Sequence, residues 1–316
     1  MKILVTGGCG YKGAVLVPKL LAVGHEVRVF DTQWFGANLK DHPAMELIKG
    51  DIRDDVPMDG IEAVIHLAGI ANDPCGELDA KLTWEVNVLA HHFLCDAAVR
   101  AGVRRFIYAS SASVYGLKGD RAVTEDDTMS PVSDYNKTKM CAERILLSYT
   151  DRMNVQIVRP ATVCGVSPRQ RLDTMVNMLT VQALKTGKIQ AHCGEHGGGL
   201  MRPNVHIDDI TDLYCWLIDH PEVQGVFNAG FENISAQVTA EMIRAFISAQ
   251  IEITKVKDKR SYLVDSSKLL SFGFRPRYKV ADAIMQIHAA WKTGTLKDSD
   301  EKYNLRWMQQ QGLVRS

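Results

Sequence analysis

The chain begins MKILVTGGCGYKG (residues 1–13), where a short apolar run leads directly into three glycines at three-residue spacing, Gly7, Gly10 and Gly13. The apolar run is typical of a buried strand, and the residues after Gly13 follow the spacing of an amphipathic helix. Such a turn needs glycine because the chain bends tightly and because Cβ atoms would obstruct a ligand that approaches the backbone amides. An ordinary strand-to-helix turn has a similar composition, so the context of the motif has to distinguish the two.

A second apolar run, HEVRVFD (residues 25–31), supplies that context because it ends in Asp31, about twenty residues after the glycines. A carboxylate at this point accepts hydrogen bonds from both hydroxyls of an adenosine ribose and repels a 2′-phosphate. Taken alone, Asp31 could be a solvated acid at a strand end. Together with the glycine loop it predicts a dinucleotide site and favours NAD over NADP. Asp51 and Ile52, which end the third apolar run, are expected to meet the adenine, one by hydrogen bond and one by packing. The predicted cofactor residues are Gly7, Gly10, Tyr11, Lys12, Gly13, Asp31, Asp51, Ile52, Leu67, Ala68 and Gly69.

Strand-like and helix-like segments alternate along most of the chain. Apolar runs of strand length occur at residues 46–52, 63–69, 105–111, 155–160 and 225–230, and helical patterns occur at 14–23, at 83–101 and from Tyr135 onward. Such alternation predicts a parallel sheet with crossover helices on both of its faces. The predicted fold class is α/β, a doubly wound parallel (Rossmann) sheet with a smaller C-terminal substrate-binding domain.

The pattern also predicts how the chain is divided between these two units. Residues 1–164 and a returning segment, 205–234, form the predicted NAD-binding Rossmann domain. Residues 165–204 and 235–316 form the predicted substrate-binding domain, which begins at an arginine-rich stretch. The tail from Thr295 onward is polar, and we expect it to be loosely ordered.

Composition narrows the classes of function. The 316 residues are 46% hydrophobic, which argues against a disordered chain, and 37 basic residues balance 37 acidic ones. A neutral chain offers no net field for nucleic acid or an anionic membrane, so an anionic ligand must be bound locally. The seven cysteines include no C-x-x-C pair, and no apolar run reaches the length of a membrane span. We therefore expect a cytoplasmic protein without a metal site, a nucleic-acid partner or a membrane span.

A candidate reaction centre follows about halfway along the Rossmann pattern. Tyr135 and Lys139 in YNKTK are spaced i and i+4, on one face of a helix, and Ser111 ends a serine-rich strand before them. A phenol is a poor base at neutral pH, so it needs a neighbouring positive charge that stabilises phenolate. Lys139 supplies that charge, and Ser111 can hold a substrate hydroxyl against Tyr135. An isolated Tyr/Lys pair is common on surface helices, but this pair comes in order after the glycine loop.

These motifs resemble those of the extended short-chain dehydrogenase/reductase family, in its NAD-dependent sugar-nucleotide epimerase/dehydratase branch. The matching stretches are TGGCGYKG, HLAG, EVNVLAHH, SSASVYG, YNKTK, VRPATVCG, MRPNVHIDD and KRSYLVDSSKLLSFGFRP. The resemblance implies that Ser111, Tyr135 and Lys139 are the catalytic residues and that Asn87 helps to bind NAD. Tyr135 and Lys139 then also contact the cofactor.

The resemblance further implies a nucleotide-diphosphate sugar as the substrate. Arg202 and Arg260 match positions that bind the diphosphate, and Arg171 and Asn177 lie in the stretch expected to contact sugar or phosphate. Dehydratases of this branch carry an Asp-Glu pair after the catalytic hydroxyl residue, whereas this chain has Ala112 and Ser113. Family members pair two helices, here residues 83–100 and 135–149, across a homodimer interface.

Three hypotheses of function follow. The first is an epimerase that works through a transient keto sugar and returns the hydride to the opposite face. The second is a net C4 dehydrogenase or reductase of a nucleotide-activated hexose or heptose. The third is a non-catalytic NAD-sensing protein, a class that commonly lacks the tyrosine or the lysine that this chain keeps as Tyr135 and Lys139.

Overall fold

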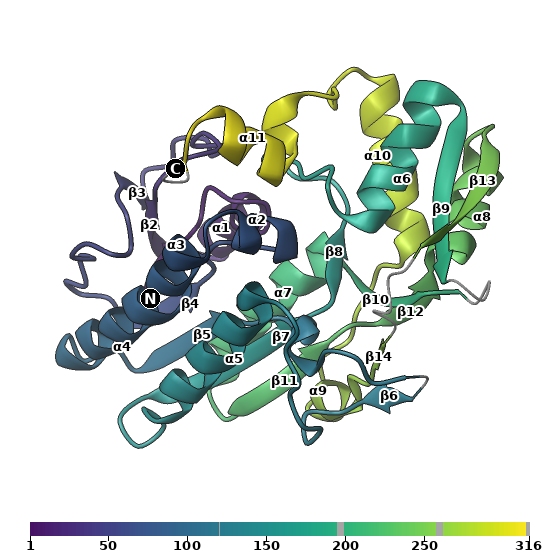
Figure 1. Cartoon of the computed structure of the whole chain (residues 1–316). Helices are drawn as coiled ribbons and strands as arrows, with labels where there is room; N and C mark the ends of the chain where they lie inside the picture. The colour runs from purple at the N-terminus through teal and green to yellow at the C-terminus, as the bar shows by residue number, and fades with distance from the viewer. Residues whose placement is uncertain (120, 195–198, 257–261, 314–316) are drawn as a thin grey trace.

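A computed structural model describes residues 1–119, 121–194, 199–256 and 262–313 of the chain. Its centre is a seven-stranded sheet in which every neighbouring pair of strands is parallel (Figure 1). From edge to edge the strands are β11 (Gly225–Ala229), β7 (Asn154–Pro160), β5 (Arg105–Ala109), β4 (Ala63–His66), β1 (Lys2–Thr6), β2 (Glu26–Asp31) and β3 (Met45–Lys49). The predicted doubly wound α/β fold is therefore confirmed.

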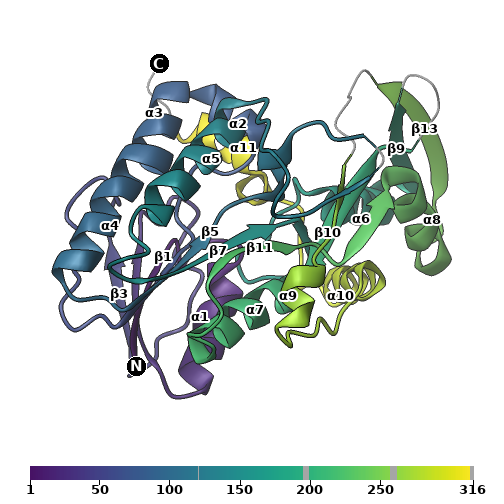
Figure 2. The same ribbon diagram turned by 90° about the horizontal axis from the view of Figure 1, so that it is seen from below.

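Helices cover both faces of this sheet, as Figure 2 shows. One face carries α1 (Gly13–Ala22) and α7 (Ile207–Asp219), and the other carries α3 (Ala80–Trp84), the π turn η1 (Glu85–Leu89), α4 (Ala90–Arg100) and α5 (Asp134–Leu147). Alternation along β1 divides the core between the two layers. Ile3 and Val5 pack in the cluster that contains residues of α1 and α7, whereas Leu4 packs in the cluster that contains residues of α4 and α5.

The remaining elements belong neither to this sheet nor to the two helical layers described above. They are α2 (Asp73–Leu78), η2 (Ala112–Tyr115), β6 (Ala122–Val123), β8 (Thr162–Cys164), α6 (Met175–Thr186), β9 (Lys188–Gly194), β10 (Met201–His206), β12 (Glu232–Ser235), α8 (Ala236–Phe246), β13 (Gln250–Val256), β14 (Leu263–Val264), α9 (Ser267–Ser271), α10 (Val280–Lys292), η3 (Asp300–Lys302) and α11 (Asn304–Gln310). Helices α6, α8 and α10 share an apolar cluster with strand β9. The division of the chain into two domains stays a prediction.

The predicted looseness of the tail is wrong for residues 295–313. This stretch contains η3 and α11, and Met308 of α11 is only 3% exposed, in an apolar cluster that also contains Ile52. Leu305 and Met308 are three residues apart and so lie on one face of the helix. This short amphipathic pattern was the signal of a docked helix within an otherwise polar tail.

Candidate active site

A cavity of about 640 Å³ opens at the carboxyl ends of the parallel strands, where ligands bind in doubly wound sheets. Most of the predicted site residues line it: Gly7, Gly10, Tyr11, Lys12, Gly13, Asp31, Asp51, Ile52, Leu67, Ala68, Gly69, Ser111, Tyr135, Lys139, Arg171 and Arg202. Two predicted residues, Asn87 and Asn177, are not among the described residues of the lining. Arg260 lies outside the described residues.

Packing requires glycine at two positions of the glycine loop, and the open cavity favours glycine at the third. Gly7 has φ +72°, and a Cβ atom there would lie 2.6 Å from the backbone nitrogen of Ala68. A Cβ on Gly13 would lie 2.5 Å from the Cα of Gly8. A Cβ on Gly10 would approach only the Gly7 carbonyl oxygen, at 3.2 Å, and Gly10 lines the cavity. An open cradle of this kind suits a diphosphate on the helix N-terminus.

Replacing Gly7 by Ala is expected to lower the free energy of unfolding by more than about 2 kcal/mol, because the added Cβ meets backbone atoms that cannot move aside. Gly24→Ala is the matched control, since Gly24 also has positive φ (+87°) but nothing lies within 4 Å of its Cβ position. That control should lose only about 1 kcal/mol. Urea unfolding of the two variants measures the difference, and equal losses would contradict the packing argument.

Asp31 is held in place at the end of β2 by two backbone donors. The amide of Cys9 in the glycine loop donates to its carboxylate over 3.0 Å, and the amide of Gln33 donates over 2.7 Å. Burial raises the pKa of Asp31, while these two donors oppose the rise. The carboxylate is thereby oriented beside the glycine loop, as a ribose-binding acid requires.

Asp51 forms an ion pair with Arg53, two residues further along the chain. Its carboxylate oxygen Oδ2 lies 2.7 Å from Nη2 of Arg53, and Arg53 also contacts Glu85. Burial alone would raise the pKa of Asp51, but the hydrogen bonds from Arg53 lower it overall. Both Asp51 and Ile52 line the cavity, and their contact with an adenine stays a prediction.

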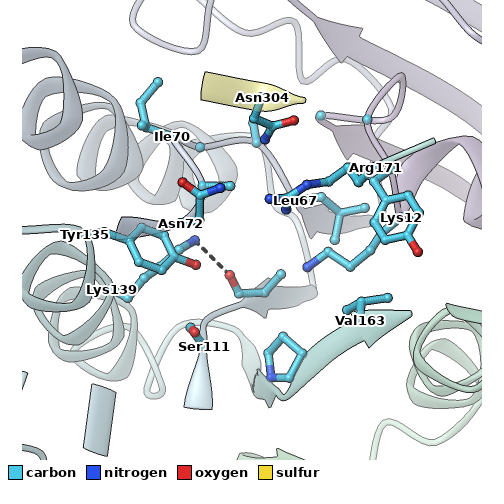
Figure 3. Close-up of a pocket in the computed structure, with 18 of the residues that line it drawn as sticks. Lys12, Leu67, Ile70, Asn72, Ser111, Tyr135, Lys139, Val163, Arg171 and Asn304 are labelled. Atoms are coloured by element: carbon cyan, nitrogen blue, oxygen red, sulfur yellow. Dashed lines mark hydrogen bonds between the residues drawn. The ribbon is translucent and has the colours of Figure 1, made fainter. Parts of the chain in front are cut away.

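Tyr135, Lys139 and Ser111 come together on one side of the cavity, as Figure 3 shows. Helix α5 begins with Ser133 as its N-cap, and its first turns carry Tyr135 and Lys139. The Lys139 ammonium donates to the carbonyl oxygen of Ala109 at the end of β5 over 2.9 Å and lies 6.0 Å from the centre of the Tyr135 ring. The same strand leads into Ser111, so β5 and α5 together position all three groups.

Burial governs the proton affinities of the pair. It raises the pKa of Tyr135, and a hydrogen bond with Ser111 is the largest opposing influence. Burial, followed by the nearby Lys12 ammonium, lowers the pKa of Lys139 to about 7. A titratable lysine beside a hydrogen-bonded phenol is the arrangement that general acid–base catalysis at a hydroxyl group requires.

Ser111 is itself oriented by its neighbours. Its hydroxyl lies 2.7 Å from the hydroxyl of Ser113, which in turn donates to the side chain of Asn136 in α5. Ser113 therefore orients the Ser111 hydroxyl and is itself too weak an acid and base to act on a substrate carbon.

Besides Lys139, the described residues of the lining include four cationic side chains, Lys12, Arg169, Arg171 and Arg202. The Arg171 guanidinium pairs with Asp173, Nε to Oδ1, at 2.8 Å. The Lys12 ammonium has no hydrogen bond or carboxylate partner among the residues that the structure describes, and it lies 5.9 Å from the centre of the Tyr214 ring. Figure 3 shows Lys12 extending into the space opposite Tyr135 and Lys139. A buried cation without a counter-ion favours an anionic ligand.

Asn87 and Asn177 direct their amides at the protein backbone. Asn87, in the π turn, accepts from the amide of Ile70 (2.9 Å) and donates to its carbonyl (3.1 Å). Asn177, fully buried, accepts from the amide of Gly165 over 3.0 Å and donates to the Arg171 carbonyl over 2.8 Å. Each asparagine therefore holds a loop that lines the cavity, and direct contact with a ligand stays a prediction.

The cavity also contains residues that the sequence analysis missed. Asn72 is the N-cap of α2 and has φ +74°. A hydrogen bond with the Asn72 backbone opposes the rise in the pKa of Tyr135. Asp73 accepts from the hydroxyl of Ser133, the N-cap of α5. Asn304, in the C-terminal helix, also lines the cavity. The Asn-Asp-Pro sequence at residues 72–74 is a helix-start signal that could have indicated the first two.

Comparison with known proteins agrees with this site. The model of the family described as "NAD dependent epimerase/dehydratase family" matches residues 3–230, well over half of the chain. The chain therefore belongs to the NAD-dependent epimerase/dehydratase family, and NAD is its cofactor. The open glycine cradle fits the diphosphate of NAD, as does the Lys12 ammonium, which has no carboxylate partner among the described residues, and the oriented Asp31 carboxylate fits a ribose.

The chain is also similar to individual proteins. It is 37% identical over 168 residues to uncharacterized protein y4nG of Sinorhizobium fredii, a match that spans 51% of this chain and 41% of that relative. It is 26% identical over 322 residues to a UDP-glucose 4-epimerase of Lactobacillus helveticus, covering 92% of this chain and 96% of the other. The crystal structure of UDP-glucuronic acid 4-epimerase from Bacillus cereus in complex with UDP-glucuronic acid and NAD aligns with a TM-score of 0.81 and 25% identity, covering 93% of this chain and 99% of that one.

Two further observations concern metals and membranes. Within the described ranges, no group of three His, Cys, Asp or Glu side chains is arranged to hold a metal ion. No helix in that part of the chain is long and apolar enough to cross a membrane.

Proposed function

We propose that this protein is an NAD-dependent epimerase of a nucleotide-diphosphate sugar. The observation that carries the proposal is the convergence of Tyr135, Lys139 and Ser111 on a cavity that also contains the NAD-binding glycine loop. The full-length similarity to a UDP-glucose 4-epimerase and the fold similarity to a UDP-glucuronic acid 4-epimerase support the same reaction.

Each residue has a distinct role in this proposal. When bound, NAD accepts a hydride from a sugar carbon and returns it. Tyr135 accepts the proton of the hydroxyl on that carbon and later gives it back, and Ser111 holds the oxygen by a hydrogen bond. Lys139, whose ammonium lies near the Tyr135 ring, favours the phenolate form. Lys139 is buried, and Ser111 and Tyr135 are half-buried, which limits the access of water to the keto sugar.

The residues after Ser111 favour epimerisation over dehydration. Dehydration needs an acid for the leaving hydroxyl and a base for a carbon-bound proton, and neither Ala112 nor Ser113 can serve. Ala112 is fully buried, and the hydroxyl of Ser113 is engaged with Ser111 and Asn136. The remaining routes begin with oxidation of the sugar and end either in return of the hydride, as proposed here, or in release of the oxidised sugar.

The arginines of the cavity are the proposed diphosphate ligands. Arg171 and Arg202 both line the cavity, and guanidinium groups bind phosphate oxygens in pairs. Arg260 is proposed for the same role from its sequence motif. Asn177 is proposed to act indirectly, because its side chain holds the carbonyl of Arg171.

The function is tested by incubating the purified protein with UDP-glucose and, separately, with UDP-glucuronic acid. We expect one of them to convert to its 4-epimer, resolved by anion-exchange chromatography, without net formation of NADH. NADH accumulating in proportion to product would favour the C4 dehydrogenase instead. Failure of the protein to isomerise any nucleotide sugar while it binds NAD would favour the sensing protein.

Binding of NAD is expected to take up protons at Lys12. Burial, with a smaller contribution from Arg171, lowers the pKa of the Lys12 ammonium to about 8. A bound diphosphate would raise this pKa, so the complex holds more protons than the free protein above about pH 8. NAD affinity should therefore fall as the pH rises from about 8 to 10. Isothermal titration at pH 8.5 in two buffers of different ionisation enthalpy measures the uptake.

The controls for this prediction separate Lys12 from the other cations. Lys12→Met should lose most of the uptake and part of the affinity. Lys12→Arg, which stays charged throughout, should lose the uptake and keep the affinity. Lys12→Arg keeps the positive charge that lowers the pKa of Lys139, so the titration of Lys139 cancels between the unaltered protein and this variant, whereas in Lys12→Met that pKa should rise. Equal proton uptake by the protein and by Lys12→Met would contradict the assignment.

We also infer that two copies of the chain associate through α4 and α5. These helices lie side by side on one face of the sheet, where Leu89 and Phe93 are 55% and 63% exposed. Exposed apolar residues clustered in this way favour a protein interface. Sedimentation velocity should give the mass of a dimer, and Phe93→Lys should shift it toward the monomer.

The seven free cysteines further support a reducing, cytoplasmic location.

A further inference from the structure

The C-terminal segment, residues 298–313, lies over one end of the cavity and is called the C-terminal clasp below. Its helix α11 packs beside α2, at the top of the molecule in Figure 1. Asn304 and Leu305 of the clasp line the same cavity as Asp31 and Ile52, which are the predicted ribose and adenine contacts. The family model ends at residue 230, so it describes no part of the clasp.

The first attachment of the clasp is a buried polar cluster around Asn304. The side-chain oxygen of Asn304 accepts a hydrogen bond from Nη2 of Arg169 over 2.6 Å, and the backbone N–H of Asn304 donates to Oδ2 of Asp173 over 3.1 Å. The guanidinium of Arg169 also lies 4.0 Å from the centre of the Phe35 ring. Arg169 is 4% exposed and Asn304 is 7% exposed. Hydrogen bonds from a buried charged group are stronger than average, so this contact resists opening.

The second attachment is to the loop that follows Asp31. The indole N–H of Trp307 donates to the carbonyl oxygen of Trp34 over 2.6 Å. Met308 buries its side chain in the cluster that contains Ile52. A backbone hydrogen bond from Leu172 to the carbonyl of Lys302, 2.8 Å long, fixes the start of the clasp. The clasp therefore joins the 34–35 loop on one side of the cavity to the 169–173 stretch on the other.

We propose that the C-terminal clasp is part of the cofactor site and controls the rate at which NAD leaves. A dinucleotide whose adenosine lies between Asp31 and Ile52 would be enclosed by Phe35, Arg169 and the clasp. Its release then requires the contacts of Asn304 and Trp307 to break. The inference rests on NAD as the cofactor and is independent of the sugar reaction proposed above.

The experiment measures release of the reduced cofactor in the absence of any sugar. Full-length protein is loaded with NADH and mixed with a large excess of NAD, and the loss of bound-NADH fluorescence gives the dissociation rate. Trp307→Phe removes the indole N–H donor and part of the ring while keeping an aromatic side chain, and it should raise this rate about fivefold. Asn304→Leu leaves the Arg169 guanidinium without its acceptor and should raise it about tenfold. Truncation after Lys297 should raise it at least as much.

Arg306→Gln is the matched control. Arg306 lies on the same helix between the two contact residues, its side chain is 61% exposed, and it contacts Asp300 at 3.7 Å on the surface. Its replacement should leave the dissociation rate within twofold. Thermal unfolding of each variant identifies loss of folding, and Trp307→Phe keeps the test valid if the truncated chain does not fold.

The outcomes are distinct. Faster release from both point variants, with the control unchanged, supports the clasp. Release at the unaltered rate from Trp307→Phe and Asn304→Leu would overturn it while leaving the epimerase proposal intact. Absence of NADH binding by the unaltered protein would instead overturn the cofactor assignment, on which the clasp and the epimerase both depend.

Discussion

Tyr135→Phe is expected to lower the turnover of a nucleotide sugar by about 10²- to 10⁴-fold, the usual contribution of a positioned acid–base group. The change removes one oxygen atom and keeps the ring that packs in the cavity beside Lys139. Lys139 retains its hydrogen bond to Ala109, so the ammonium stays in place. Binding of NAD should therefore be nearly unchanged, which assigns the loss to proton transfer.

Tyr149→Phe is the matched control for this substitution. Tyr149 lies just beyond the other end of α5, where its hydroxyl contacts Asp96 over 2.6 Å, away from the cavity lining. Its turnover should stay within twofold of the unaltered protein. Steady-state rates with the active nucleotide sugar, and the NAD content of each protein, provide the comparison. Full turnover by Tyr135→Phe would remove Tyr135 from the mechanism.

Glu143→Leu is expected to destabilise the folded protein by about 3–5 kcal/mol, because it leaves a buried guanidinium without its counter-ion. Glu143 is fully buried, and Arg159 is 3% exposed. Their contacts are bidentate, with Nη2 to Oε2 at 2.7 Å and Nε to Oε1 at 3.0 Å. Arg159 also donates to the Tyr115 hydroxyl over 2.7 Å, and the hydroxyl of Ser110 donates to Glu143.

This network lies next to the proposed catalytic residues. Glu143 is one helical turn beyond Lys139 on α5, and Ser110 immediately precedes Ser111. The pair therefore fastens α5 to β5 and β7, the elements that bring Ser111 to Tyr135. Weakening it should reduce catalysis together with stability, whereas Tyr135→Phe should affect catalysis alone.

A double-mutant cycle with Arg159→Met distinguishes the ion pair from simple packing. Because the double variant buries no unpaired charge, it should regain at least about 2 kcal/mol relative to the sum of the single losses. Removing the exposed pair of Arg104 and Glu62, whose side chains are 70% and 37% exposed, should cost less than about 1 kcal/mol. Urea unfolding measures all of these. A Glu143→Leu loss as small as that of the exposed pair would contradict the prediction.

Local patterns predicted much of the fold and the centre of the site. The strand, glycine loop and helix at residues 1–22 are consecutive in the chain, so spacing alone indicated them. Tyr135 and Lys139 share a helix face because they are four residues apart. Asp31 is the last residue of the second strand, and parallel strands end at the same edge of a sheet.

Other assignments could not be read from spacing. Asn87 and Asn177 occur in the expected motifs, but the tertiary structure turns their amides toward the Ile70 and Gly165 backbones. A side chain on the buried face of a helix meets whatever element packs there, and the choice depends on the whole core. The clasp is the largest omission, because Asn304 meets Arg169 across 135 positions of sequence.

The sequence by itself determined the cofactor-binding fold, the preference for NAD and the Tyr135–Lys139 pair, since each depends on residues close together in the chain. Only the tertiary structure decided that the polar C-terminal tail closes over the cofactor end of the cavity. The physical reason is that short amphipathic helices gain little stability alone and form against the surface that buries their apolar face. That surface, built from α2 and the 34–35 loop, exists only after the sheet has assembled.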